Sequence, residues 1–268
     1  MEKAIPPNVA EALDRFAEVI DLCREELSHV SLVEERTYEY AIARAYSKVL
    51  LTCCEIHTLL FAGFPEGALA LSRSLYEALV IIQILLQGKR ACDVSLIERF
   101  FDAAEINKIK IYLDRVIWIT EKSSKNELAA KLKRSYSEKL ESYKEKYEGR
   151  EFRNNYWWAK VRDFGELAEK SGFDKLPIYS RLSGNVHFNA YDVFTYIRTE
   201  GSVLIGETYN GIEFPLWLSS FFLYCICGLL QNSYPVLISE STVEKLLSCA
   251  EYLSERYYAK IGVKMFQT

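Results

Sequence analysis

Apolar side chains recur at helical spacing along most of the chain. In the first stretch Val9, Leu13, Phe16 and Ile20 share one helical face. Similar patterns return as far as the C-terminal region, and they predict a single, mainly α-helical domain, a multi-helix bundle over residues 1–268. The expected blocks are N-terminal helices within 8–62, central helices within 66–171 and C-terminal helices within 213–260.

Local capping and breaking signals set the expected boundaries. Ser31 with Glu34 is a capping-box pattern, which predicts a long helix from about 31 to 62. Gly63 and Pro65 then break the chain before a helix at 66–87. A shorter helix is expected at 160–171, ended by Gly172.

Two segments depart from the long-helix pattern. Residues 178–190 carry a cluster of polar side chains and are expected to be at least partly helical. Residues 193–206 are rich in β-branched and aromatic side chains around Glu200 and Gly201. This composition predicts a small β-hairpin insertion.

The segment 214–239 has no charged side chain. Its length and apolarity approach those of a membrane span. A helix that is apolar all round also occurs in the centre of a bundle or in a subunit interface. We favour a buried helix that also offers a homo-oligomer contact, and we do not expect the protein to be a membrane protein.

Composition narrows the chemistry further. The net charge of -4 argues against binding of a polyanion by the chain as a whole. Seven cysteines, an odd number placed mostly among apolar residues, predict buried free thiols in a reducing compartment. Without an apolar leader at the N-terminus, the cytoplasm is the expected location. No cofactor or metal motif is present, so neither is expected.

Arg73 and Glu77 are the first candidates for a site. They lie four residues apart on the 66–87 helix, so they share one face among apolar neighbours. One interpretation is an ion pair that fixes the position of the helix. The other is an anion or substrate clamp formed by Arg73 and oriented by Glu77.

The 178–190 segment holds the second set of candidates. Tyr179, Ser183 and His187 fall at i, i+4 and i+8, and Arg181 lies between them. Histidine titrates nearest neutrality, so His187 is the best candidate for acid–base chemistry. The alternative is a buried network in which these groups satisfy one another. A Ser–His hydrolase is not supported, because the G-x-S-x-G motif is missing.

The segment Ser72-Arg-Ser-Leu-Tyr-Glu77, together with Tyr179-x-x-x-Ser183-x-x-x-His187, resembles the bacterial domain-of-unknown-function family numbered 5677. The resemblance implies an all-helical fold in which Arg73, Glu77, Ser183 and His187 converge. It brings no known activity.

Arg181 and His187 also fit the R-x(4–6)-H spacing of the HEPN helical ribonucleases, which this chain resembles in class. That resemblance implies metal-independent cleavage, with His187 as acid or base and an arginine on the phosphate. Arg24 and His29 fit the same spacing, so the spacing alone is not specific.

The leading hypothesis is therefore a nucleic-acid-directed effector in phage defence or a toxin–antitoxin pair, with RNA or a nucleotide as its ligand. One alternative is a non-catalytic module that dimerises through 214–239. The other is a small-molecule pocket in the bundle, lined by Arg73, Tyr179 and His187.

Residues 121–153 form the most basic part of the sequence. They hold ten Lys and Arg against seven Glu, and Tyr136, Tyr143 and Tyr147 are interspersed among the charges. Such a segment could bind single-stranded nucleic acid. Alternating charge is also typical of a solvated helix face, which is the interpretation that we favour from sequence.

Overall fold

Prolines mark the start of two long helices. Helix α1 spans Pro7–Ser28 and α3 spans Pro65–Arg90, each with proline in the first turn, where its missing N–H is not needed. The computed structural model describes residues 5–32, 34–122, 126–148, 152, 154–173 and 211–261. Those residues are helices and their connections, without a strand. The hairpin predicted at 193–206 lies outside them and stays a prediction.

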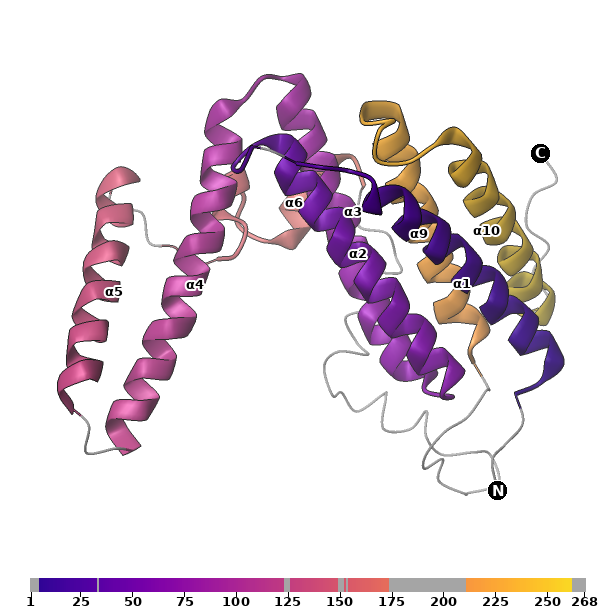
Figure 1. Cartoon of the computed structure of the whole chain (residues 1–268), viewed down its shortest axis with the longest axis horizontal. Coiled ribbons are helices and arrows are strands. Elements are labelled where there is room, and N and C mark those ends of the chain that lie inside the picture. The colour runs from indigo at the N-terminus through magenta and orange to yellow at the C-terminus, as the bar shows by residue number, and fades with distance from the viewer. Residues whose placement is uncertain are drawn as a thin grey trace.

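The helices form a bundle and a projecting arm. Figure 1 shows α1, α2, α3, α9 and α10 packed together, while α4 and α5 run antiparallel and project away from them. The prediction of a mainly α-helical fold is confirmed. The remaining elements are α2 (Tyr38–Phe61), α4 (Val94–Lys122), α5 (Asn126–Lys146), the 3-10 helix η1 (Trp157–Ala159), α6 (Phe164–Ser171), α9 (Glu213–Ser233) and α10 (Glu240–Ile261).

One apolar core joins the helices of the bundle. Phe16 of α1, Tyr46 of α2, Tyr76 of α3 and Phe222 of α9 are all fully buried. Helix α9 packs against both α3 and α10, which is why it needs apolar side chains on most of its circumference. Helix α9 ends at Ser233, before the end of the uncharged segment 214–239.

Helices α3 and α9 are both long and apolar enough to cross a membrane. More than half of the most apolar stretch of each, 56% and 61%, is buried inside the protein. Core helices of soluble proteins have the same length and composition, so this property does not decide where the protein resides.

The predicted start of the second helix was wrong. Helix α2 begins at Tyr38, where the Thr37 side chain accepts a hydrogen bond of 3.2 Å from the Tyr40 amide. Arg36, the residue before Thr37, has a φ of 63°, which a right-handed helix does not accommodate. The capping pattern at Ser31 is therefore not used to start this helix.

The helix expected at 160–171 is shorter than predicted. Helix α6 begins at Phe164, because the Asp163 side chain accepts from the Glu166 amide and caps it. Its predicted end is confirmed, since Gly172 follows with a φ of 84°.

Candidate functional site

Helix α3 holds Arg73 and Glu77 on one partly exposed face. Arg73 Nε donates a hydrogen bond of 3.0 Å to Glu77 Oε1. The two side chains are 20% and 29% exposed, so neither is buried in the core nor fully solvated. The predicted i, i+4 pair is confirmed, and its carboxylate fixes one edge of the guanidinium.

The buried face of the same turn anchors α3 to α9. Ser72 is fully buried, donates to the Ala68 carbonyl at 2.9 Å and lies 2.9 Å from the hydroxyl of Ser219. This hydroxyl pair satisfies both polar groups where the two apolar helices meet. The position of α3, and with it Arg73, is therefore set by a specific contact across the core.

Tyr76 connects this part of α3 to the end of α6. Its hydroxyl donates to the Phe173 carbonyl at 3.1 Å, and its ring packs edge-on against Phe164. Gln87, three turns further along α3, makes a similar contact, because its side-chain amide donates to the Ser171 carbonyl at 3.1 Å. The chain that leaves α6 thus begins beside the turn that carries Arg73 and Glu77.

The other predicted site residues, Tyr179, Arg181, Ser183 and His187, lie outside the described residues. Whether they converge with Arg73 and Glu77 stays a prediction. Of the remaining histidines, His29 is exposed on the surface, whereas His57 is half-buried and its ring packs against Phe61. Burial lowers the pKa of His57, which favours its neutral form.

All seven cysteines are free thiols, and four of them are buried, but Cys54 and Cys225 are only partly buried and Cys92 is exposed, so the prediction of buried thiols is confirmed only in part. Cys23 and Cys227 form a buried cluster with Tyr46, whose hydroxyl lies 3.4 Å from Cys227 Sγ. Burial raises the pKa of the Cys227 thiol well above its ordinary value, so this thiol is protonated at neutral pH, whereas the hydrogen bond with Cys227 lowers the pKa of Cys23. Within the described part of the chain, no group of His, Cys, Asp or Glu is arranged to hold a metal ion.

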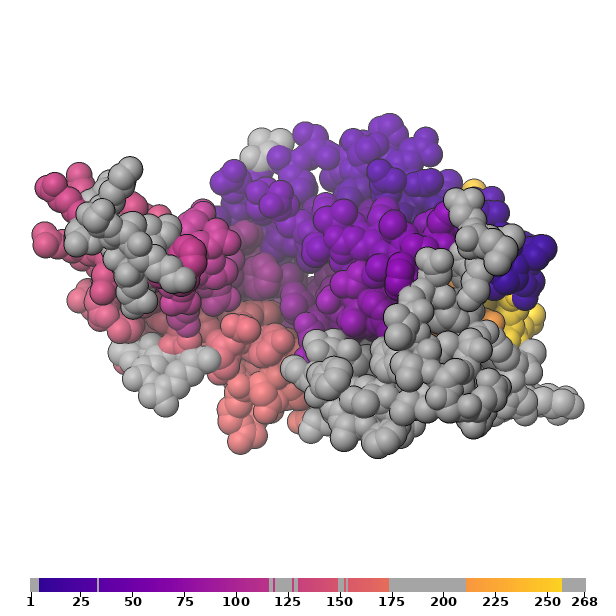
Figure 2. Space-filling view, turned by 90° about the horizontal axis from the view of Figure 1, so that it is seen from below, coloured from indigo at the N-terminus to yellow at the C-terminus, as the bar shows by residue number. Residues whose placement is uncertain are grey.

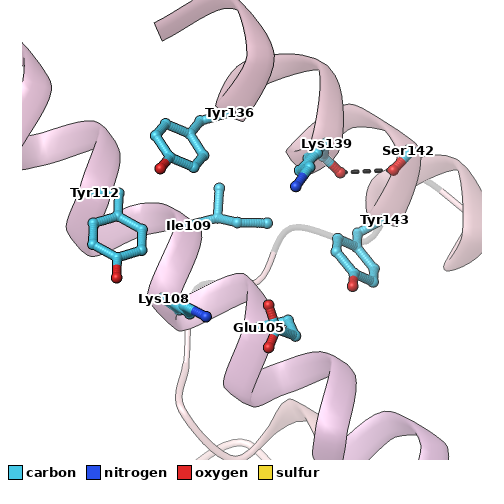
Figure 3. Close-up of a pocket in the computed structure, with 8 residues that line it drawn as sticks. All are labelled: Glu105, Lys108, Ile109, Tyr112, Tyr136, Lys139, Ser142 and Tyr143. Atoms are coloured by element: carbon cyan, nitrogen blue, oxygen red, sulfur yellow. Dashed lines mark hydrogen bonds between the residues drawn. The ribbon is translucent and has the colours of Figure 1, made fainter. Parts of the chain in front are cut away.

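A second candidate site lies between α4 and α5 of the arm, in a groove of about 490 Å³ (Figure 3). We call it the arm groove. Eight residues line it, namely Glu105, Lys108, Ile109 and Tyr112 from α4 and Tyr136, Lys139, Ser142 and Tyr143 from α5.

Sequence reasoning found only part of this groove. The basic segment at 121–153 included Tyr136 and Tyr143, but Lys108 and Tyr112 of α4 were missed. Their four-residue spacing, which puts a lysine and a tyrosine on one helical face, was the available signal. That this face meets α5 depends on how the two helices pair.

Comparison with known proteins gives one match. The sequence model of a family of unknown function, DUF5677, matches residues 39–202. The match covers more than half of the chain, from the start of α2 through the arm to the 178–190 segment. No curated protein and no solved structure matches significantly.

Proposed function

The chain belongs to the DUF5677 family, whose function is unknown, and we propose from its own residues that it is a nucleic-acid-directed effector that cleaves RNA without a metal ion. His187 is the general acid or base of this proposal. Arg181 or Arg73 contacts the phosphate, and Glu77 orients Arg73.

The observation that carries the proposal is the Arg73–Glu77 pair. The guanidinium lies in the middle of a largely apolar helix, is partly exposed, and has one edge held by a carboxylate 3.0 Å away. A planar guanidinium fixed in this way is suited to a phosphate, which arginine recognises through several N–H donors at once.

Chain connectivity supports a common site. Tyr76, on the same turn as the pair, holds the Phe173 carbonyl. Tyr179 follows Phe173 by six residues, which span at most about 20 Å when fully extended. This connectivity is compatible with a polar segment that folds back onto the Arg73 face of α3.

The proposed chemistry balances without a cofactor. A base removes the proton from a ribose 2′-OH, the 2′ oxygen attacks the adjacent phosphorus, and the bond to the 5′ oxygen breaks as that oxygen is protonated. The arginine offsets the negative charge that develops on the phosphate oxygens. Ser183 and Tyr179, which precede His187 by four and eight residues, orient the imidazole. The resemblance of the Arg181–His187 spacing to that of the HEPN ribonucleases suggests a role in phage defence or a toxin–antitoxin pair.

The test uses purified protein, RNA and a metal chelator. We expect cleavage to persist with chelator, and His187→Ala to lower it by about 10²–10⁴-fold while the thermal midpoint stays nearly unchanged. The matched control is His29→Ala, because His29 is exposed directly after the end of the first helix. If His187→Ala instead unfolds the protein, the buried-network interpretation replaces this one.

A second candidate function is a protein-interaction module that dimerises through α9. Trp217 and Phe221 stack on its outer face, with ring centroids 6.0 Å apart, and Phe221 is 36% exposed. Such an aromatic stripe, on a helix whose only charged residue is Glu213 at its start, is suited to a partner helix. Light scattering should then show a dimer that Phe221→Lys converts to a monomer. A wild-type monomer at high concentration would rule this function out.

A further inference from the structure

Positive charge is concentrated in the outer part of the arm. Residues 108–139 contain nine Lys and Arg against four Asp and Glu, a net charge of +5, whereas the whole chain carries -4. The remainder of the chain therefore carries -9. A basic projection on an acidic protein attracts polyanions to that projection and keeps them away from the body.

The arm groove lies within this basic region. Figure 3 shows Ile109 in its floor, with Tyr112 and Tyr136 on one side and Glu105 and Tyr143 on the other. The rings of Tyr112 and Tyr136 are stacked, with centroids 5.5 Å apart and an angle of 24° between the planes. Both rings are partly exposed, so the pair presents aromatic surface to solvent.

The two lysines of the groove are available for a ligand. Lys144 and Lys146, further along α5, are already paired with Glu141 and Asp102. Among the described residues, Lys108 and Lys139 take part in no ion pair, and both are exposed. An ammonium group in this state can exchange its counterions for phosphate oxygens.

We propose that the arm groove binds single-stranded nucleic acid, with a base stacked on the Tyr112–Tyr136 pair and phosphates on Lys108 and Lys139. Aromatic rings next to cations match the alternation of base and phosphate along a single strand. In a duplex the bases are stacked on one another and present no face to these rings. The inference does not depend on cleavage, since a strand can bind here whether or not His187 is catalytic.

Binding is measured by fluorescence anisotropy with labelled oligonucleotides of about 12 units, a length within the usual range for such sites. Oligo(U) and oligo(dT) serve as the two single strands, which share the proposed chemistry. We expect either or both to bind, and the same strand in a duplex to bind at least about tenfold more weakly. An acidic peptide of similar charge is the competing polyanion.

Two sets of variants test the two halves of the site. Lys108→Ala and Lys139→Ala should each reduce the dependence of log affinity on log salt by about 0.7, the value for one phosphate contact on a single strand. Lys245→Ala is the matched control, because it removes the same charge from an exposed position on α10 of the bundle. Tyr136→Leu should weaken binding about tenfold, whereas Tyr136→Phe, which keeps the ring, should not.

The folding of each variant is checked by circular dichroism. The proposal is overturned if no single strand binds, if a duplex or the acidic peptide binds equally well, or if Lys245→Ala has the same effect as Lys139→Ala. Equal loss in Tyr136→Leu and Tyr136→Phe would also overturn the stacking part of it.

Discussion

Asp102 of α4 joins three parts of the chain that are distant in sequence. Its side chain is only 3% exposed and accepts hydrogen bonds from Arg36 at 2.5 Å and from Lys146 and Tyr147 at 2.7 Å. Burial by itself would raise the pKa of this carboxyl, but the three donors outweigh it and hold the pKa below its ordinary value. The base of the arm is thus fastened by an ionised group.

We expect Asp102→Asn to lower the free energy of unfolding by about 1–3 kcal/mol at pH 7, because an amide cannot replace the charged acceptor. A depressed pKa means that the stabilisation is complete above about pH 5 and is lost as the pH falls through the folded-state value. The difference between wild type and variant should therefore shrink at pH 3. Urea titrations at both pH values test this, with Glu98→Gln, an exposed position on α4, as control. An equal difference at both pH values would contradict it.

Two helical glycines should respond to alanine with opposite signs. A Cβ on Gly88 of α3 would lie 2.5 Å from the Tyr38 hydroxyl, which donates to the Asp93 carbonyl at 2.7 Å. A Cβ on Gly228 of α9 would meet nothing within 4 Å. Gly88→Ala should destabilise the protein by about 1–3 kcal/mol, whereas Gly228→Ala should stabilise it by about 0.5–1 kcal/mol. Urea unfolding midpoints of the two variants and the wild type test this prediction. A shift in the same direction for Gly88→Ala and Gly228→Ala would contradict it.

At the scale of elements, α5 differs from every helix of the bundle. None of its side chains that the structure describes is fully buried, and its main packing partner is α4. Helix α3, in contrast, buries residues along its whole length against α2, α6 and α9. Most helical stability comes from packing an apolar face, so α5 has the least support.

We expect the amide hydrogens of α5 to exchange with solvent at least about tenfold faster than those of α3, because local opening of α5 exposes little apolar surface. Hydrogen exchange followed by mass spectrometry measures both helices in one sample. Peptides from α9 provide the internal reference for the bundle. Equal protection of α5 and α3 would mean that the arm opens only together with the bundle.

The elements also show how far local signals extend. Arg73 and Glu77 were predicted as a pair because i, i+4 geometry is a property of the helix itself. The start of α2 was mispredicted, because Ser31 offers a valid local cap while a distant contact, Arg36 with Asp102, holds the turn before Tyr38. The arm groove could not be predicted in full, because it forms between α4 and α5 and sequence periodicity does not specify that these helices pair.

At the scale of the whole molecule, the thiols report on global unfolding. Cys92 is exposed, whereas Cys53 and Cys227 are fully buried, and burial raises the pKa of both. Only the thiolate reacts with disulfide reagents, so buried protonated thiols react when the fold opens.

We expect one rapid reaction with a disulfide reagent at neutral pH, at Cys92, followed by slower phases, and full reaction of all seven thiols in denaturant. Cys92→Ser should remove the rapid phase and leave the slow phases unchanged. Cys53→Ser is the matched control at a buried site, and it should keep the rapid phase. A rapid phase that persists in Cys92→Ser would show that the core opens readily.

The sequence by itself determined the helical class, several helix ends such as Gly172, the Arg73–Glu77 pair and membership of the family. These features depend on interactions within one or two turns or on a motif written in the chain. Only the tertiary structure decided that Ser72 meets Ser219, that Asp102 gathers three donors and that Lys108 faces the tyrosines of α5. Each of these depends on which faces of separate helices come together, and packing of the whole core selects those faces.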